Sequence, residues 1–316
     1  MRISRRLGLL LSPVLAVAAV LIGGSVYLRH RPLDLPASLR FPAASERSSL
    51  SLRYLGIAGY EIDDGNTVIL VDPTVTRPTL FGLFLGRLRP DERLAARVFP
   101  RADYILVKHA HYDHAVDVPA IALRTGATVV GSQSAVNLAL SRGVPPERTI
   151  LAKPGDRLSL GGFTVDVRAY QHSKILGMED VMTGTIPSDA GKLWWWQYLQ
   201  DGSLSYRLES RRTSIWFAGP STFEGTEVPP AGSLAMGVAG HQYDAQRLKR
   251  ILERARPKRF FPSHYDNFFQ PLSKGLGRMP VVDLEAVVKM TAAAAPGLPI
   301  YFLDHNERIE LPEDQP

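Results

Sequence analysis

The sequence predicts an α/β protein that follows an apolar N-terminal helix. Three observations lead to this class. Residues 104–141 alternate between short apolar runs and helical patterns that end at a glycine, which is typical of layered α/β folds. The composition, with 45% hydrophobic and 22% charged residues, is that of a globular domain with a sizeable core. Ahead of that domain, residues 7–28 contain no charged side chain.

The N-terminal apolar segment, Leu7–Leu28, is long enough to cross a membrane, because a bilayer core of about 30 Å needs about 20 apolar residues. Three arginines precede it, so we expect an uncleaved signal anchor that places the following domain outside the cytoplasm, on the periplasmic or extracellular face. Cleavage near Ala16–Ala18, or a twin-arginine signal at Ser4–Arg6, would instead give an exported soluble protein.

The anchor and a linker precede one large domain. We assign residues 1–31 to the signal anchor or signal peptide, 32–48 to a linker with several prolines and serines, and 49–312 to the domain. No repeat or low-complexity tract follows the linker. We therefore expect a single folded unit after residue 48.

The domain alternates strand and helix patterns. Apolar alternation on both sides of the turn Asp63–Asn66 predicts antiparallel strands at Ser49–Tyr60 and Thr67–Val71. Helices are predicted at Val118–Thr125, Ser134–Ser141, Tyr243–Ala255 and Val281–Ala294. Further strands are predicted at Ala127–Gly131, Asp156–Leu160, Phe163–Tyr170, Leu193–Leu199, Ser214–Ala218, Arg259–Pro262 and Pro299–Leu303. The apolar run Thr79–Leu88 is expected to form a core helix, or else an apolar lip that faces lipid or an acyl chain.

Charge and cysteine content narrow the classes of partner. The formal net charge is +6, but the basic residues are scattered along the chain without a long Lys/Arg run. We therefore expect no nucleic-acid partner, and assign the excess charge to solubility and to the membrane surface. The chain contains no cysteine, which excludes disulfides and thiolate metal sites.

The stretch His109–His114, with the sequence HAHYDH, directly follows an apolar strand pattern. Imidazole nitrogens and carboxylate oxygens are the ligands that zinc takes when no thiolate is available. In extended backbone, side chains two residues apart point the same way, so His109 and His111 can bind one ion together. Asp113 and His114 face differently and allow a second ion. A surface loop rich in histidine by chance is the weaker alternative, because three of the eight histidines fall within these six residues.

This stretch resembles the HxHxDH signature of the metallo-β-lactamase superfamily. Other segments between residues 50 and 310 resemble the same family in the same order, namely Tyr54–Tyr60, Leu70–Pro73, Gln171–Ser173, Trp216–Gly219 and Pro262–His264. The chain looks most similar to the branch that holds ascorbate-6-phosphate lactonase and N-acyl-phosphatidylethanolamine phospholipase D. The resemblance implies a four-layer αββα sandwich, with metal ligands on loops at one edge of two sheets.

The resemblance also implies the remaining ligands. Two ion sites would form, one from His109, His111 and His172 and the other from Asp113, His114 and His264. Asp72 would orient the HAHYDH loop from outside the ligand set, although a plain Asp-Pro turn is an equal alternative. His241 would lie near the mouth of the pocket, with a surface histidine as the alternative.

One position departs from the family pattern. The family carries an aspartate that bridges the two ions where this chain has Pro220, which has no side-chain oxygen. Glu224 is the nearest carboxylate that could take its place. A pair of ions bridged by solvent, a single-ion site and a protein that has lost turnover all remain open at this stage.

From these residues and the resemblance we expect a membrane-anchored, zinc-dependent hydrolase of an ester, a lactone or a phosphodiester, with a small-molecule or lipid-like substrate. One or two Zn²⁺ ions, or alternatively Mn²⁺ or Fe²⁺, would activate the attacking water, and Asp113 and His114 are the expected catalytic residues. The alternative is a metal-binding member of the superfamily whose turnover is reduced or lost because of Pro220. A nuclease of this family would need a basic groove and an extra domain, for which the chain has no room.

Overall fold

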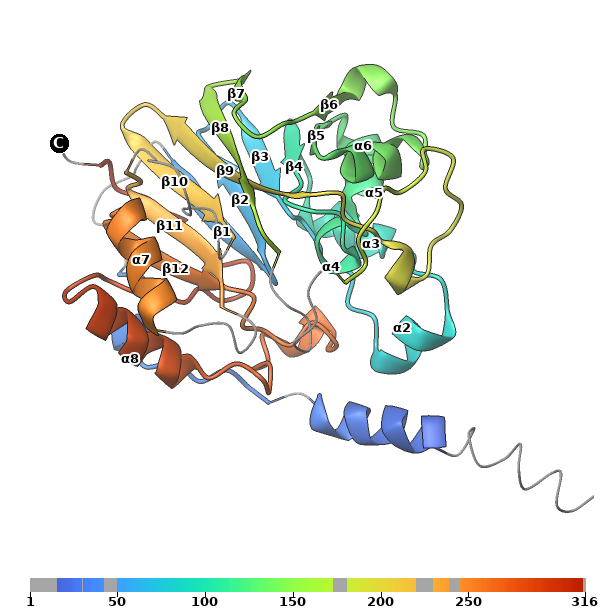
Figure 1. Cartoon of the computed structure of the whole chain (residues 1–316), viewed down its shortest axis with the longest axis horizontal. Helices are drawn as coiled ribbons and strands as arrows, with labels where there is room; N and C mark the ends of the chain where they lie inside the picture. Colours follow the sequence, from blue (N-terminus) through green and yellow to red (C-terminus); the bar gives the residue numbers. More distant parts are fainter. Residues whose placement is uncertain are drawn as a thin grey trace, which may run out of the picture.

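Two mixed β-sheets packed face to face form the centre of the structure (Figure 1). The computed structural model describes residues 16–29, 31–42, 50–172, 181–219, 230–238 and 245–314. The first sheet, in spatial order, contains β13 (Arg308–Glu310), β1 (Ser51–Gly56), β2 (Gly59–Asp63), β3 (Val68–Val71), β4 (Tyr104–Leu106), β5 (Thr128–Gly131) and β6 (Thr149–Leu151). The second contains β12 (Arg259–Ser263), β11 (Ser233–Gly237), β10 (Thr213–Ala218), β9 (Ser203–Ser210), β8 (Phe163–Tyr170) and β7 (Arg157–Leu160).

Each sheet combines antiparallel and parallel pairs. Strands β1, β2 and β3 pair antiparallel, whereas β3 to β6 run parallel. The turn predicted at Asp63–Asn66 joins β2 and β3, but the single strand predicted at Ser49–Tyr60 is divided into β1 and β2 by a turn at Gly56 and Ile57, where φ is positive. Parallel neighbours need a long crossover, which the intervening helices supply. In the second sheet β7 to β10 are antiparallel and β10 to β12 parallel. The predicted α/β class is therefore confirmed, and the structure adds that both sheets are mixed.

Helices lie on the outer faces of both sheets (Figure 1). Outside the first sheet lie α3 (Glu92–Val98), α5 (Val118–Thr125) and α6 (Gln133–Leu140), and outside the second lie α7 (Ala245–Ala255) and α8 (Leu284–Ala294). Strand β3 shows why its sequence is apolar throughout. Ile69 and Val71 join the core between the sheets, while Val68 and Leu70 pack on the helix side, so both faces of the strand are buried.

Two predicted strands are wrong. Leu193–Leu199 contains a 3₁₀ turn at Trp195–Gln197, in which the Gln197 side chain accepts a hydrogen bond from the Trp194 backbone. Aromatic residues favour strands, but here the rings of Trp194 and Trp196 stack 5.0 Å apart on the turn. Pro299–Leu303 makes only an isolated bridge, between Ile300 and Phe260.

The predicted membrane anchorage is also wrong, since none of the helices formed by the described residues is long and apolar enough to cross a membrane. Residues 16–27 are helical, and these 12 residues at about 1.5 Å each extend about 18 Å, short of a bilayer core of about 30 Å. Residues 7–15 of the predicted span lie outside the described part. The carbonyl of Leu28 accepts hydrogen bonds from Asn267 and Gln270, both at 2.7 Å. The expected position of the domain outside the cytoplasm depended on the anchor and is withdrawn with it.

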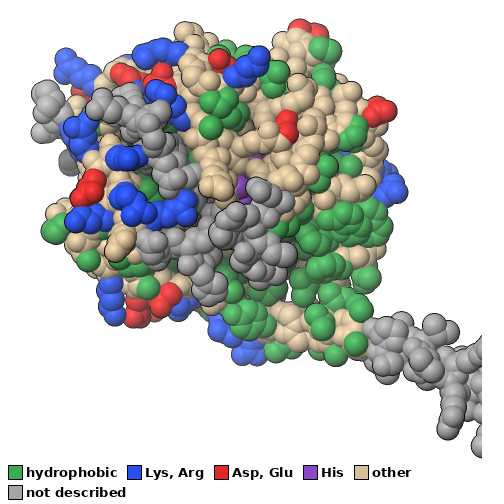
Figure 2. Space-filling view, in the orientation of Figure 1, with side chains coloured by type: hydrophobic (Ala, Val, Ile, Leu, Met, Phe, Trp, Pro, Cys, Tyr) green, Lys and Arg blue, Asp and Glu red, His purple; other side chains and the backbone are tan. Residues whose placement is uncertain are grey.

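The apolar run Thr79–Leu88 forms the short helix α2 (Leu80–Leu85). Leu83 and Leu88 are buried, as expected of a core helix, whereas Leu85 is 69% exposed. Figure 2 shows an apolar area over α2 and the neighbouring N-terminal helix.

Candidate metal centre

Four loops that follow strands meet at one edge of the two sheets. Asp72 follows β3, the HAHYDH stretch follows β4, His172 follows β8 and His264 follows β12. Residues His109 to His111 form the loop itself, and the next turn is the short helix α4 (Tyr112–Ala115). This edge therefore gathers all six side chains that the sequence and the resemblance pointed to as ligands.

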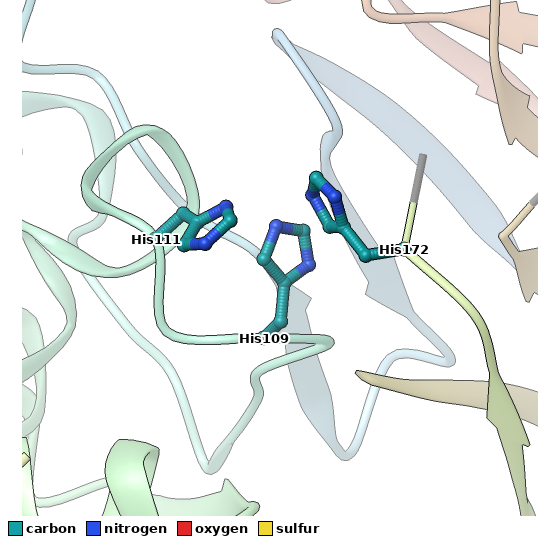
Figure 3. A group of neighbouring side chains, drawn as sticks. All are labelled: His109, His111 and His172. Atoms are coloured by element: carbon teal, nitrogen blue, oxygen red, sulfur yellow. The ribbon is translucent and has the colours of Figure 1, made fainter. Parts of the chain in front are cut away.

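The first triad consists of His109, His111 and His172. One ring nitrogen from each of the three lies within 4.8 Å of the others, and Figure 3 shows the rings facing one another from two separate segments. His109 and His111 are buried, at 2% exposure each. Burial, together with the neighbouring imidazoles, holds the pKa of His109 well below its usual value and lowers the pKa of His111 to about 4. Both rings are therefore neutral near pH 7, the form that binds metal ions.

A second contact orients each of these two buried rings. The hydroxyl of Tyr170 lies 3.0 Å from Nδ1 of His109, and a backbone hydrogen bond links the ring of His111 to Met182. Nε2 of His109 and Nε2 of His111 are both buried and have no hydrogen-bond partner. A buried nitrogen without a hydrogen-bond partner lowers the stability of the fold. We therefore expect these two atoms to bind a ligand that accepts their lone pairs.

The second triad consists of Asp113, His114 and His264, whose ligand atoms also lie within 4.8 Å of one another. Nε2 of His264 lies 3.2 Å from Oδ2 of Asp113, and Nε2 of His114 lies 3.7 Å from the same oxygen. Burial alone would raise the pKa of Asp113, but the imidazoles of His114, His264 and His111 outweigh it and hold that pKa well below its usual value. The triad therefore presents a carboxylate and two imidazoles.

Asp72 contacts this triad from outside. Its Oδ2 lies 2.7 Å from Nδ1 of His114, and its Oδ1 accepts a hydrogen bond from the backbone of Lys108 at 2.8 Å. The ammonium of Lys108 lies 3.3 Å from the same carboxylate. Asp72 thus fixes one ring nitrogen of His114 and leaves Nε2 directed at Asp113, which is how carboxylates orient metal-binding histidines in general.

His264 is held by a buried network behind the second triad. It adopts a left-handed backbone with φ of 60°, and its N–H donates to the carbonyl of Ile57. Asp266, two residues on, accepts hydrogen bonds from the Ile57 backbone at 2.7 Å and from the Tyr54 hydroxyl at 2.9 Å. Its other oxygen pairs with Arg77 at 3.1 Å, and both charged side chains are at most 2% exposed. The hydrogen bonds therefore tie the loop of His264 to the end of β1, and the ion pair ties it to the segment that follows β3.

The donor set fits a divalent ion of the zinc class. Five imidazoles and one carboxylate supply nitrogen and oxygen ligands, and the buried Nε2 atoms of His109 and His111 have no hydrogen-bond partner. Contacts from outside the two triads orient the rings of His109 and His114. Pro220, Glu224 and His241 lie outside the described residues. The described part of the structure therefore does not include the position at which the family carries its bridging aspartate.

Several residues of the site were missed from the sequence. Tyr170 ends β8 and lies two positions before His172, so its proximity to the first triad could have been inferred from its position in the sequence. Asp266, Arg77 and Met182 carry no such signal, because their partners are distant in sequence.

A small pocket opens beside the first triad. It has a volume of about 300 Å³, and its lining includes His172 from the triad, Tyr170 at the end of β8 and Gln200–Ser203 before and at the start of β9. The pocket therefore adjoins the imidazoles, and its lining includes Tyr170, which also contacts the ring of His109.

The sequence is similar to that of known proteins of one family. A family model described as "Beta-lactamase superfamily domain" matches residues 67–224. A protein named UPF0173 metal-dependent hydrolase from Carboxydothermus hydrogenoformans is 28% identical over 268 residues, which cover 83% of this chain and 100% of that protein. A protein of the same name from Myxococcus xanthus is 27% identical over 278 residues, covering 84% and 88% of the two chains.

Solved structures with the same fold include proteins of different chemistry. A metallo hydrolase of Ignicoccus hospitalis has a TM-score of 0.52 at 16% identity, covering 82% of this chain and 97% of that chain. The diiron beta-hydroxylase CmlA of Streptomyces venezuelae has a TM-score of 0.54 at 14% identity, covering 84% and 55%. An isothiocyanate hydrolase from Delia radicum gut bacteria has a TM-score of 0.51 at 13% identity, covering 83% and 99%. At these identities the similarity concerns the fold alone.

Proposed function

The chain belongs to the beta-lactamase superfamily, and on that basis we propose that it is a metal-dependent hydrolase that works at the two triads. The observation that carries the proposal is the pair of buried Nε2 atoms on His109 and His111, two members of the first triad, which have no hydrogen-bond partner. A structural cluster of histidines would satisfy such atoms within the protein. Two relatives that carry the name metal-dependent hydrolase, matched over 100% and 88% of their lengths, support the same interpretation.

We further propose that the resident ion is zinc, because the donors are imidazoles and one carboxylate and no thiolate is present. His109, His111 and His172 would hold the first ion, and Asp113, His114 and His264 the second. Mn²⁺ and Fe²⁺ accept the same donors and are the alternatives. When bound, such ions supply Lewis acidity toward the substrate and the attacking water.

The protein contributes by selecting the tautomer of each ligand histidine, so that the nitrogen that binds the ion carries no proton. For His109 to offer Nε2, its Nδ1 must carry the proton and donate it to the Tyr170 oxygen 3.0 Å away. In the same way Asp72 accepts the Nδ1 proton of His114 at 2.7 Å. These contacts select one tautomer for each ring, so the reactive edge needs no rearrangement before substrate binds.

We propose an ester, a lactone or a phosphodiester of a small molecule as the substrate class. To test this, the purified chain would be stripped with a chelator, reloaded with Zn²⁺, Mn²⁺ or Fe²⁺, and assayed with p-nitrophenyl acetate, γ-butyrolactone and bis(p-nitrophenyl) phosphate. Metal content would be measured in parallel. We expect metal-dependent hydrolysis of at least one class, which the His109→Ala variant lacks.

The position of Pro220 in the sequence favours one other function, a metal-binding protein with reduced or lost turnover. That function would give stoichiometric metal and no hydrolysis of any of the three substrates. A wild-type chain that binds no metal would reject both functions.

A further inference from the structure

The contact between Tyr170 and His109 is one step in a longer series of buried hydrogen bonds. A side-chain hydrogen bond links Tyr170 to Ser203 at the start of β9, and the Ser203 hydroxyl donates to Oε1 of Gln200 at 2.7 Å. Gln200 and Ser203 are only 7% and 4% exposed. The series therefore joins the first triad to a segment that supplies none of the six expected ligands.

The amide oxygen of Gln200 gives this series a direction. Oε1 can only accept, so the Ser203 hydroxyl uses its one proton there and its oxygen is left to accept from Tyr170. The Tyr170 hydroxyl, which donates to Ser203, in turn accepts from Nδ1 of His109. The ring proton of His109 is therefore on Nδ1, and Nε2 keeps its lone pair.

The opposite direction would remove His109 as a ligand. The ring of His109 lies between those of His111 and His172, with centroids 4.7 and 4.6 Å away (Figure 3). Nε2 of His109 is buried and has no hydrogen-bond partner, so a proton on it would lack an acceptor and would also exclude a metal ion from that nitrogen. The direction that begins at Gln200 is thus the one that a metal site requires.

The backbone of the same segment supports the other buried ring of the triad. The N–H of Gln200 donates to the carbonyl of Met182 at 2.9 Å, and the ring of His111 also hydrogen bonds to the backbone of Met182. Asp201, the next residue, accepts a hydrogen bond from the Ser132 hydroxyl at 2.6 Å and so anchors the segment to the start of α6. The segment therefore supports His109 through side chains and His111 through its backbone.

We propose that Gln200 and Ser203 are positioning residues of the metal centre, which act through Tyr170 to keep the ring proton of His109 on Nδ1 and so leave Nε2 available to an ion. The inference rests on the proposed metal-dependent function, but the tautomer can be measured without metal. Because the support of His111 is a backbone contact, loss of a side chain in this segment should affect His109 and leave His111 unchanged.

Two-bond ¹H–¹⁵N spectra of the full metal-free chain, labelled at histidine, report which ring nitrogen carries the proton. We expect wild-type His109 to be protonated on Nδ1 near pH 7. In Ser203→Ala the Tyr170 hydroxyl loses its acceptor and can donate to Nδ1 instead, so a form protonated on Nε2 should appear. Gln200→Met should give the same form, because it frees the Ser203 hydroxyl to donate to Tyr170. The signals of His111 should keep their positions in both variants.

Two further variants control for general loss of stability. Ser203→Thr keeps the hydroxyl and should restore the wild-type tautomer of His109. Ser205→Ala is the matched control, because Ser205 is also a buried serine on β9 but donates to the backbone of Arg168 at 3.3 Å. It should leave the tautomer unchanged, and a change as large as that in Ser203→Ala would overturn the inference.

Metal affinity tests whether Ser203 acts through Tyr170. Competition between the full chain and a chromogenic chelator for Zn²⁺ should show that Ser203→Ala weakens the first ion about threefold to tenfold, the usual factor for one lost hydrogen bond. In a Tyr170→Phe background the same change should alter the affinity less than about twofold, because the series is already broken. Equal losses in the two backgrounds would overturn the path through Tyr170.

The two measurements separate this inference from the proposed function. A shifted tautomer in Ser203→Ala, together with a wild-type chain that binds no ion, would support the hydrogen-bond series and reject the metal-dependent function. A wild-type chain that binds metal, with the same tautomer and affinity in Ser203→Ala and Gln200→Met, would support the metal centre and overturn the inference. Protonation of wild-type His109 on Nε2 would also overturn it.

Discussion

The two triads lie side by side, with the rings of His109 and His114 only 3.9 Å apart, but they are held in different ways. In the first triad, partners outside the cluster fix His109 and His111, and the Nε2 atom of each stays unpaired. In the second, Asp113 already contacts both of its partners, at 3.2 and 3.7 Å. His109 and His111 therefore each offer a ligand atom without a hydrogen-bond partner, whereas the ligand atoms of the second triad contact one another.

This difference implies an order of binding. An ion in the first triad replaces no existing hydrogen bond at His109 or His111 Nε2, whereas an ion in the second must displace the contact between Asp113 and His264. The carboxylate of Asp113 works in the opposite direction, because its charge attracts a dication. We therefore infer that the first ion binds more tightly by a moderate factor, and that residues behind each triad affect mainly their own ion.

The largest effects should come from removing one ligand from each triad. We expect His109→Ala to lose most of the metal and to lower hydrolysis about a thousandfold or more, because the first ion and the Lewis acidity it supplies are lost. His264→Ala should lose about one ion and keep the first. Elemental analysis of dialysed protein measures both. The control is His305→Ala, a partly buried histidine outside both triads, and equal metal loss in the His109 and His264 variants would remove the distinction between the triads.

The ion pair behind the second triad provides the next test. Asp266→Asn leaves Arg77 buried without its counter-charge, which should lower the free energy of unfolding by about 3 kcal/mol and weaken the second ion more than the first. The double variant Arg77→Met with Asp266→Asn removes the unpaired charge and should recover part of that loss. Urea denaturation and metal titration of the three proteins give the answer. A variant that loses the first ion preferentially would show that the network does not act through His264.

These two triads also show what could be predicted from sequence. The contiguous HAHYDH stretch lies on one loop, so its chemistry was visible from residue types and spacing, and the resemblance supplied His172 and His264. The ion pair between Arg77 and Asp266 joins residues far apart in the chain, and no local pattern marks it. The failed strand at Leu193–Leu199 has a local cause that strand propensity does not capture, the cap that the Gln197 side chain forms on the turn.

A smaller effect is expected at Tyr170, which contacts the first triad. Tyr170→Phe removes the acceptor for Nδ1 of His109 and should weaken the first ion about tenfold, the usual order for a partner that orients a ligand. Tyr206→Phe is the matched control, because Tyr206 is also buried but donates to the backbone of Val107 at 2.8 Å. Competition with a chromogenic chelator measures both affinities. Equal weakening in the two variants would assign the effect to general loss of stability.

The smallest effect should be a pH dependence of the metal-free chain. The folded-state pKa of His111 is lowered to about 4, so between about pH 4 and 6.5 the unfolded chain binds more protons and the folded chain loses stability as pH falls. The slope from this histidine is at most about 1.4 kcal/mol per pH unit. Asp117, whose pKa burial raises to about 6, acts in the opposite direction, so the comparison must be made with a variant. Denaturation in chelator at pH 5 and pH 7 should show a flatter dependence in His111→Gln, and identical slopes would contradict the neutral buried imidazole.

Stepwise titration of the metal-free wild-type chain with Zn²⁺ or Co²⁺, followed by calorimetry and native mass spectrometry, tests the inequality of the two triads most directly. We expect two ions per chain that bind in separate steps, the first about tenfold or more tighter than the second, with His264→Ala losing the second step and Tyr170→Phe shifting only the first. Two ions of equal affinity would contradict the difference between the triads. A chain that takes up no ion at all would contradict the metal centre itself.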